Sequence, residues 1–153
     1  MNRRYLVSKI LLVDGVLLIV VAFIHLFATP IISKWLSREL TAAPLENISA
    51  PFLLNHIVVG ILLIPFGVST LYSAIGIRGG QGWARGIAIT NAIVVLIFPL
   101  LIAWLMGTQY FTAPLFLVAT ILITLIGLSM VLPLIWLGRD STFDNHSHIH
   151  HHH

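Results

Sequence analysis

Four long runs of apolar residues constrain the fold of this chain more than any other feature of its sequence. The runs cover residues 10–28, 51–77, 83–106 and 113–137. A helix needs roughly 20 apolar residues to cross the hydrocarbon core of a bilayer, and each run meets this length. Charged residues make up only 8% of the 153 residues, against about a quarter in a soluble domain. We therefore predict an all-α integral membrane protein in which residues 1–138 form an antiparallel bundle of four transmembrane helices.

The distribution of Lys and Arg predicts how the chain crosses the membrane, because cytoplasmic loops carry an excess of these residues. One predicted side carries Arg3, Arg4, Lys9, Arg78, Arg85 and Arg139, whereas the other carries Lys34 and Arg38. We therefore expect a multi-pass protein of the cell membrane with its N-terminus and its C-terminus in the cytoplasm. The formal net charge of +3 does not indicate a nucleic-acid partner.

Residues 31–50 differ from the apolar runs on either side of them. Apolar residues, Trp35 and Leu36 among them, recur there at helical spacing beside charged residues. A helix of this kind lies in the headgroup region of a bilayer, with its tryptophan at the interface. We expect a short interfacial helix between the first and second spans.

Small and polar residues mark the faces on which membrane helices pack, because close approach and interhelical hydrogen bonds hold such helices together. A stripe of this kind in the second run comprises His56, Gly60, Leu63, Gly67, Thr70 and Ala74. A stripe in the fourth run comprises Thr120, Thr124, Gly127 and Val131. Successive members are three or four residues apart, so each stripe lies on one face of its helix. We expect both stripes to face the interior of the bundle.

Asp14, His25 and His56 are acidic or imidazole side chains inside the predicted spans, where such groups are costly and often functional. His25 lies near the end of the first run and His56 near the start of the second, so their imidazoles are expected at one depth. Two such histidines can bind haem b, or supply ligands to copper or zinc. Gly60 would leave room for a flat macrocycle, and Met106 could complete a metal site. The alternatives are an interhelical hydrogen bond and a proton-linked role.

Helical periodicity places Asp14 on the same helix face as His25, an arrangement with which a proton relay could begin. Asp14 also lies about one turn inside the N-terminal end of the first span, which Arg3, Arg4 and Lys9 precede. Lys9, Arg85 or the side-chain amide of Asn91 in the third span could therefore pair with it. We expect this pairing to be structural.

Residues 139–153 form a predicted cytoplasmic tail that is rich in histidine. Its histidines are His146, His148, His150, His151, His152 and His153. Such a run binds transition metals. It is either a cloning tag or a natural metal-binding tail, since Ser147 and Ile149 interrupt it as they would not interrupt a simple tag.

The absence of cysteine excludes disulfides, thiolate metal sites and thiol-redox chemistry. The sequence also lacks the short motifs of hydrolases and phosphoryl-transfer enzymes. We therefore expect a non-catalytic subunit or assembly factor of a larger membrane complex, in contact with lipid and with other subunits or copies of itself. A bis-histidine haem b or copper protein of electron transfer, and a proton or small-solute carrier, remain alternative functions.

Single cysteines at Ser33 and Ser141 test the predicted orientation. In intact cells, Ser33→Cys should react with a membrane-impermeant maleimide, because residues 31–50 are predicted to lie outside. Ser141→Cys should react only after the membrane is permeabilised. The unmodified chain lacks cysteine and serves as the blank. Labelling of Ser141→Cys but not of Ser33→Cys in intact cells would mean that the orientation is inverted.

Overall fold

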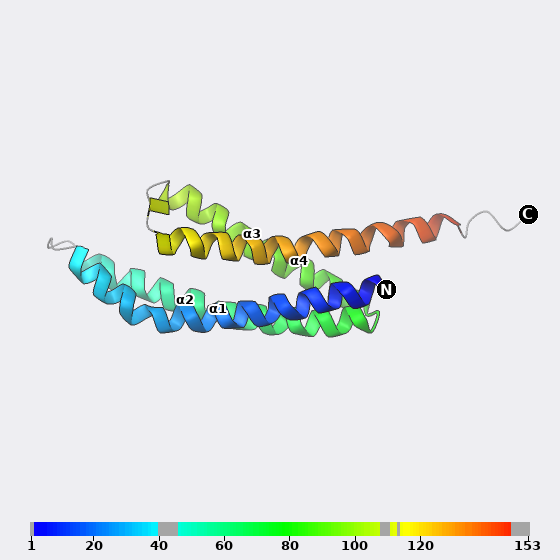
Figure 1. The fold of residues 1–153 in the computed structure, drawn as a ribbon, viewed down its shortest axis with the longest axis horizontal. Coiled ribbons are helices and arrows are strands. Elements are labelled where there is room, and N and C mark those ends of the chain that lie inside the picture. Colours follow the sequence, from blue (N-terminus) through cyan, green and yellow to red (C-terminus); the bar gives the residue numbers. More distant parts are fainter. Residues whose placement is uncertain (1, 40–45, 108–110, 113, 148–153) are drawn as a thin grey trace, which may run out of the picture. The chain divides into compact units, whose positions relative to one another are not determined.

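A computed structural model describes residues 2–39, 46–107, 111–112 and 114–147 of the chain. The main elements are four helices, which Figure 1 labels in chain order. They are α1 (Arg3–Glu39), α2 (Glu46–Arg78), α3 (Gly82–Met106) and α4 (Pro114–Ser147). Each contains a segment long and apolar enough to cross a membrane. The prediction of four membrane-length helices is therefore confirmed.

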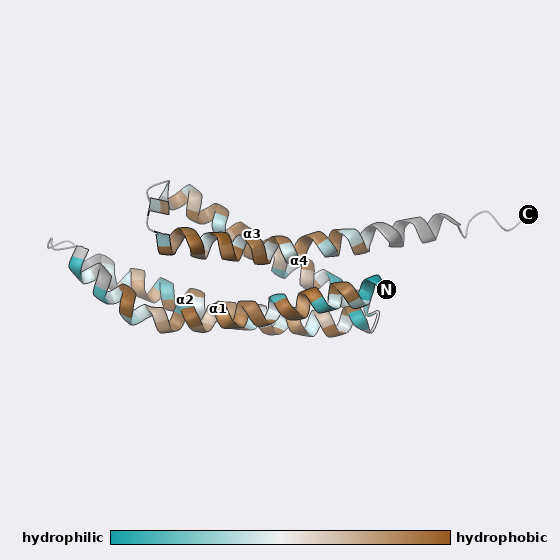
Figure 2. Ribbon diagram, in the orientation of Figure 1, coloured by the Kyte–Doolittle hydropathy of each residue, from teal (hydrophilic) through white to brown (hydrophobic). Residues whose placement is uncertain are grey.

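Apolar residues occur around these helices rather than along one side only (Figure 2). Large apolar side chains are exposed on them, including Phe27 at 77% and Trp104 at 78% of their surface. In water such a helix would be strongly disfavoured, whereas lipid chains solvate it on every side. The composition of each helix thus suits a membrane.

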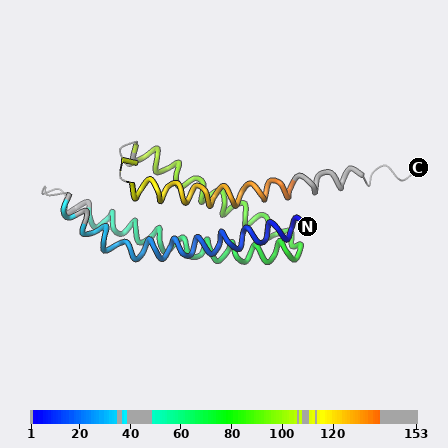
Figure 3. The backbone as a smooth tube through the Cα atoms, viewed as in Figure 1, coloured from blue at the N-terminus to red at the C-terminus, as the bar shows by residue number. Residues whose placement is uncertain are grey.

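Helix α1 continues through Pro30 to Glu39. Figure 3 draws the backbone of this helix as a tube. We expected the first span to end at Ala28 and a separate short helix to follow. The structure shows no separate helix over residues 31–39, and residues 40–45 lie outside the described part. Proline lacks an N–H and its ring crowds the carbonyl of residue i−4, but membrane helices accommodate it because neighbouring groups and local adjustments satisfy the freed carbonyl, so the helix can continue past Pro30.

Helix α4 also extends further than its apolar run, past Gly138 to Ser147. A glycine ends a helix when it adopts a positive φ, as Gly107 does after α3 with a φ of 68°. Gly138 does not adopt a positive φ, whereas Gly80, in the turn between α2 and α3, has a φ of 74°. The first nine residues of the predicted tail are therefore helical, although the segment apolar enough to span a membrane ends at Gly138.

The chain divides into two compact units, each of which is described by itself. Unit 1 comprises Met1–Asp14 and Ser69–His153, and unit 2 comprises Gly15–Val68. In unit 1, α3 packs along α4. Gly127 of α4 is buried there, and a Cβ atom added to it would lie 2.8 Å from the side chain of Leu96 of α3.

In unit 2, two buried glycines of α2 lie against α1. A Cβ atom added at Gly67 would lie 2.5 Å from Ile19 Cγ1 and 2.8 Å from the carbonyl oxygen of Gly15. One added at Gly60 would lie 2.8 Å from the side chain of Leu26. The glycines therefore allow the backbones of α1 and α2 to approach closely, as small residues do between membrane helices.

Alanine substitutions test whether this close approach stabilises the protein. Gly67→Ala should lower the free energy of unfolding in detergent by about 1–3 kcal/mol, because the new methyl group meets the backbone of Gly15. Gly60→Ala should cost less, since the end of the Leu26 side chain can move. Gly86→Ala is the matched control, because a Cβ atom there meets nothing within 4 Å. An equal effect at Gly67 and Gly86 would contradict the account.

Candidate functional site

Asn91 is buried in unit 1 and joins α3 to α2. Its side-chain amide donates hydrogen bonds to Ser69 Oγ at 2.7 Å and to Thr70 Oγ1 at 3.1 Å. An amide left unpaired in hydrocarbon would be costly. These two hydrogen bonds therefore favour the association of α3 with α2.

Asp14 of α1, in the same unit, is paired with Ser129 of α4. Ser129 Oγ lies 2.5 Å from Asp14 Oδ1. We expected Lys9, Arg85 or Asn91 as the partner, and that expectation was wrong. The amide of Asn91 is directed to α2, and the ammonium group of Lys9 lies over an aromatic ring. Asp14 thus joins α1 to α4 through a neutral partner.

The Ser129 hydroxyl makes a second contact within its own helix. Its Oγ also lies 2.9 Å from the carbonyl oxygen of Ile126. The one hydroxyl proton is thus shared between the Asp14 carboxyl oxygen and a main-chain oxygen. Asp14 Oδ2 is buried without a hydrogen-bond partner among the described residues, which favours an uncharged carboxyl group.

His25 and His56 form a contact between α1 and α2 in unit 2. Their rings are stacked, with centroids 3.6 Å apart and planes inclined by 26°. His56 Nε2 donates to the main-chain carbonyl oxygen of His25 at 2.9 Å, and Thr29 Oγ1 donates to the same oxygen at 3.3 Å. Within the described part of the chain, His25 Nε2 is buried without a partner. The pair therefore makes one interhelical hydrogen bond, the structural alternative considered above.

This arrangement does not support haem b at His25 and His56. Axial imidazoles bind iron through lone pairs in their ring planes, from opposite faces of the macrocycle. Rings stacked 3.6 Å apart leave no room for a macrocycle between them, and His56 Nε2 already serves as a donor. The space expected beside Gly60 is occupied by Leu26.

A metal site is likewise not supported by the residues that the structure describes. The described residues contain no group of three or more His, Cys, Asp or Glu side chains that could hold a metal ion. The side chain of Met106 lies outside the described part. The tail side chains also lie outside it, namely those of His146, His148, His150, His151, His152 and His153. Metal binding by these residues stays a prediction.

The threonines of the α4 stripe make hydrogen bonds within their own helix. Thr120 Oγ1 donates to the carbonyl oxygen of Phe116 at 2.8 Å, and Thr124 Oγ1 donates to that of Thr120 at 2.7 Å. Ser129, which lies off the stripe, makes a hydrogen bond that joins α4 to α1. Sequence reasoning missed it, although a serine in an otherwise apolar helix is itself a signal of an interhelical contact.

A double-mutant cycle tests the role of Asn91. Asn91→Ala and Thr70→Ala should each destabilise the protein in detergent, with a coupling free energy of about 0.6–1.7 kcal/mol, the usual scale of such bonds in membranes. Thr90→Ala is the control, because the exposed Thr90 hydroxyl donates to Gly86 of its own helix. A coupling of Asn91 to Thr90 as large as that to Thr70 would contradict the assignment.

No protein-family model, curated protein or solved structure matches the chain. An inference about its function therefore depends on the contacts described above.

Proposed function

We propose that this chain is a non-catalytic integral membrane protein that acts as a subunit or assembly factor of a larger membrane complex. The supporting observation is that polar side chains within its helices bond the helices to one another. Asn91 bonds to α2, Asp14 to α4 and His56 to α1. Polar groups used in this way hold a helical scaffold together, and a scaffold is what a structural subunit provides.

Exposed apolar faces support the same proposal. On α3, Leu100 is exposed over 68%, Trp104 over 78% and Leu105 over 68% of their surface. Such a face is stable against lipid chains or against the helices of another subunit, including a second copy of this chain. We propose that part of this surface contacts partner subunits and the rest contacts lipid.

We propose that the four helices form an antiparallel bundle in the cell membrane, with both termini in the cytoplasm. Contacts between α1 and α2 support the antiparallel order, because position 56 meets position 25 and position 67 meets positions 15 and 19. The excess of Lys and Arg on one side supports the orientation. In this arrangement residues 31–50 lie at the outer interface, where the end of α1 and the beginning of α2 supply the interfacial helix.

A proton-linked carrier is the second candidate, and the Asp14–Ser129 pair is the observation that favours it. A carboxyl group that holds its proton inside the membrane can release it when its surroundings change. Asp14 Oδ2 and His25 Nε2 are buried polar atoms without a hydrogen-bond partner among the described residues. Both groups lie on α1.

The size of the native assembly distinguishes the two candidates. When the chain is extracted in mild detergent from its own membranes, the subunit proposal expects a particle well above one 16.9 kDa protomer with its micelle. It also expects that deletion of the chain lowers the amount of a second membrane protein. Asp14→Asn should leave the assembly intact, since the amide oxygen of Asn can still accept a hydrogen bond from Ser129.

The contrary result is a lone protomer whose loss changes no other membrane protein. In that case, proton flux into proteoliposomes that contain the purified chain should be measured. Flux that Asp14→Asn abolishes, and that Thr90→Ala leaves unchanged, would establish the carrier in place of the subunit.

A further inference from the structure

Five basic residues gather at one end of unit 1, and the proposed function assigns them no ligand. They are Arg3, Arg4, Lys9, Arg78 and Arg85, named here the basic end. The first four have exposed side chains. Among the side chains that the structure describes, Asp14 is the only acidic one, and Ser129 is bonded to it. Lys9 and Arg78 thus have no acidic counterpart among the side chains that the structure describes.

Three arginine side chains of the basic end contact an aromatic ring or a glycine of another segment of unit 1. The Arg3 guanidinium lies 4.6 Å from the centroid of the Trp136 ring. The Arg4 guanidinium lies against Gly80, in the turn between α2 and α3, and that of Arg85 lies against Gly138 of α4. These contacts bring the start of α1, the α2–α3 turn and α4 together within unit 1, so the charges form one cluster.

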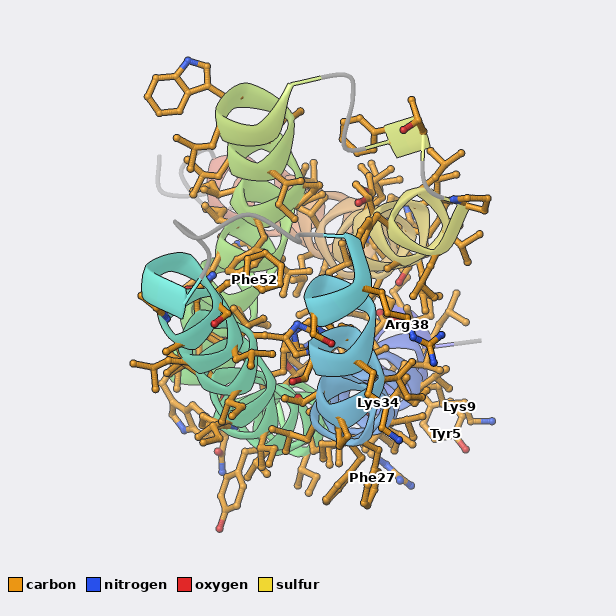
Figure 4. All side chains as sticks on the ribbon, turned by 90° about the vertical axis from the view of Figure 1, so that its left-hand side faces the viewer. Tyr5, Lys9, Phe27, Lys34, Arg38 and Phe52 are labelled. Atoms are coloured by element: carbon orange, nitrogen blue, oxygen red, sulfur yellow. The ribbon has the colours of Figure 1, made fainter. Side chains whose placement is uncertain are left out.

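Tyr5 holds two cations of the cluster close to each other. Lys9 Nζ lies 4.7 Å and the Arg78 guanidinium 5.0 Å from the centroid of its ring, and Figure 4 labels Tyr5 and Lys9 side by side. Two cations on one ring are separated by less than about 10 Å, the Debye length at 0.1 M salt, so their repulsion is not fully screened. An anion placed between them would relieve this repulsion and accept hydrogen bonds from both.

The position of the basic end favours a lipid as the source of that anion. The apolar segments of the helices begin or end at Arg3, Arg78, Gly82 and Gly138, so the cluster is located where hydrocarbon gives way to headgroups. Tyr5 and Trp136 are partly exposed, as aromatic residues at a membrane interface are. Exposed apolar residues follow along the helices, such as Val13 at 59% and Leu132 at 60% of their surface. A ligand with an anionic head and apolar chains matches both parts.

We propose that the basic end binds the phosphodiester headgroup of an acidic phospholipid. Lys9 and Arg78 contact the phosphate from either edge of Tyr5, and the remaining arginines supply further positive charge. Guanidinium groups are well suited to this role because they bind phosphate oxygens with two parallel hydrogen bonds. The acyl chains then lie along the apolar faces of the helices, as the chains of a bound lipid do.

Native mass spectrometry of the full chain in detergent, titrated with phosphatidylglycerol or phosphatidylcholine, tests the proposal. The two lipids share their acyl chains and differ in the charge of the headgroup. The unmodified protein should bind phosphatidylglycerol about tenfold more tightly or better, the effect of one to two basic residues near an anionic surface. Combining Lys9→Gln with Arg78→Gln should remove most of this preference.

Two further variants make the test specific. Combining Lys34→Gln with Arg38→Gln removes one Lys and one Arg from the other end of α1, both exposed and labelled in Figure 4, and should leave the preference unchanged. Combining Lys9→Arg with Arg78→Lys keeps the charge and should preserve most of the preference. The variant with Gln at positions 9 and 78 should keep the melting temperature of the unmodified protein in detergent, which excludes misfolding as the cause of a loss.

Three results would overturn the proposal. The first is an equal loss of preference in the two glutamine variants, which would indicate a general effect of net charge. The second is an unchanged preference when Lys9 and Arg78 are both replaced by Gln. The third is complete displacement of phosphatidylglycerol by soluble glycerol phosphate, which would show that the site recognises a free phosphate rather than a lipid.

Discussion

The absence of water from the bilayer core is the constraint on which the rest of this structure depends. Hydrophobic burial gives little drive for association in lipid, so helices must be held by close packing and by hydrogen bonds between their few polar groups. The chain meets this need at separate places. Asn91 and the Asp14–Ser129 pair act in unit 1, whereas Gly67 and the His25–His56 pair act in unit 2. The hydrogen bonds of Asn91, Ser129 and His56 thereby lower the cost of placing polar groups in hydrocarbon.

The same constraint separates the parts of the chain by role. Asn91, Ser129 and His56 bond to other helices of the chain, and the outward faces are largely apolar. Groups that can meet an external ligand are then found where the apolar segments end, as at the basic end of unit 1. A structural subunit that binds acidic lipid at its edge is consistent with this division, since neither role needs a catalytic group.

The length of the apolar runs was enough to predict four membrane-length helices. A bilayer imposes a minimum length on a spanning helix, and few helices of soluble proteins are both that long and so poor in charged residues. Helix ends were harder to predict, since Pro30 and Gly138 are breakers that a helix can accommodate. Counting residues from the ends of the apolar runs predicted that His25 and His56 lie at one depth. The orientation of their rings depends on side-chain rotamers, which sequence spacing does not determine. The partner of Asp14 lies 115 residues away along the chain, so local sequence held no signal for the pairing.

The most direct test of the central claim compares His25→Ala with His56→Ala. Because His56 donates to a main-chain oxygen of residue 25, this interhelical hydrogen bond survives in His25→Ala and is lost in His56→Ala. We therefore predict that His56→Ala lowers the free energy of unfolding more, by roughly 0.6–2 kcal/mol. Neither variant should alter visible absorption or core metal content when residues 146–153 are deleted. Equal effects of the two variants, together with loss of a Soret band or of stoichiometric metal in both, would contradict the claim, because a bis-histidine site depends equally on each ligand.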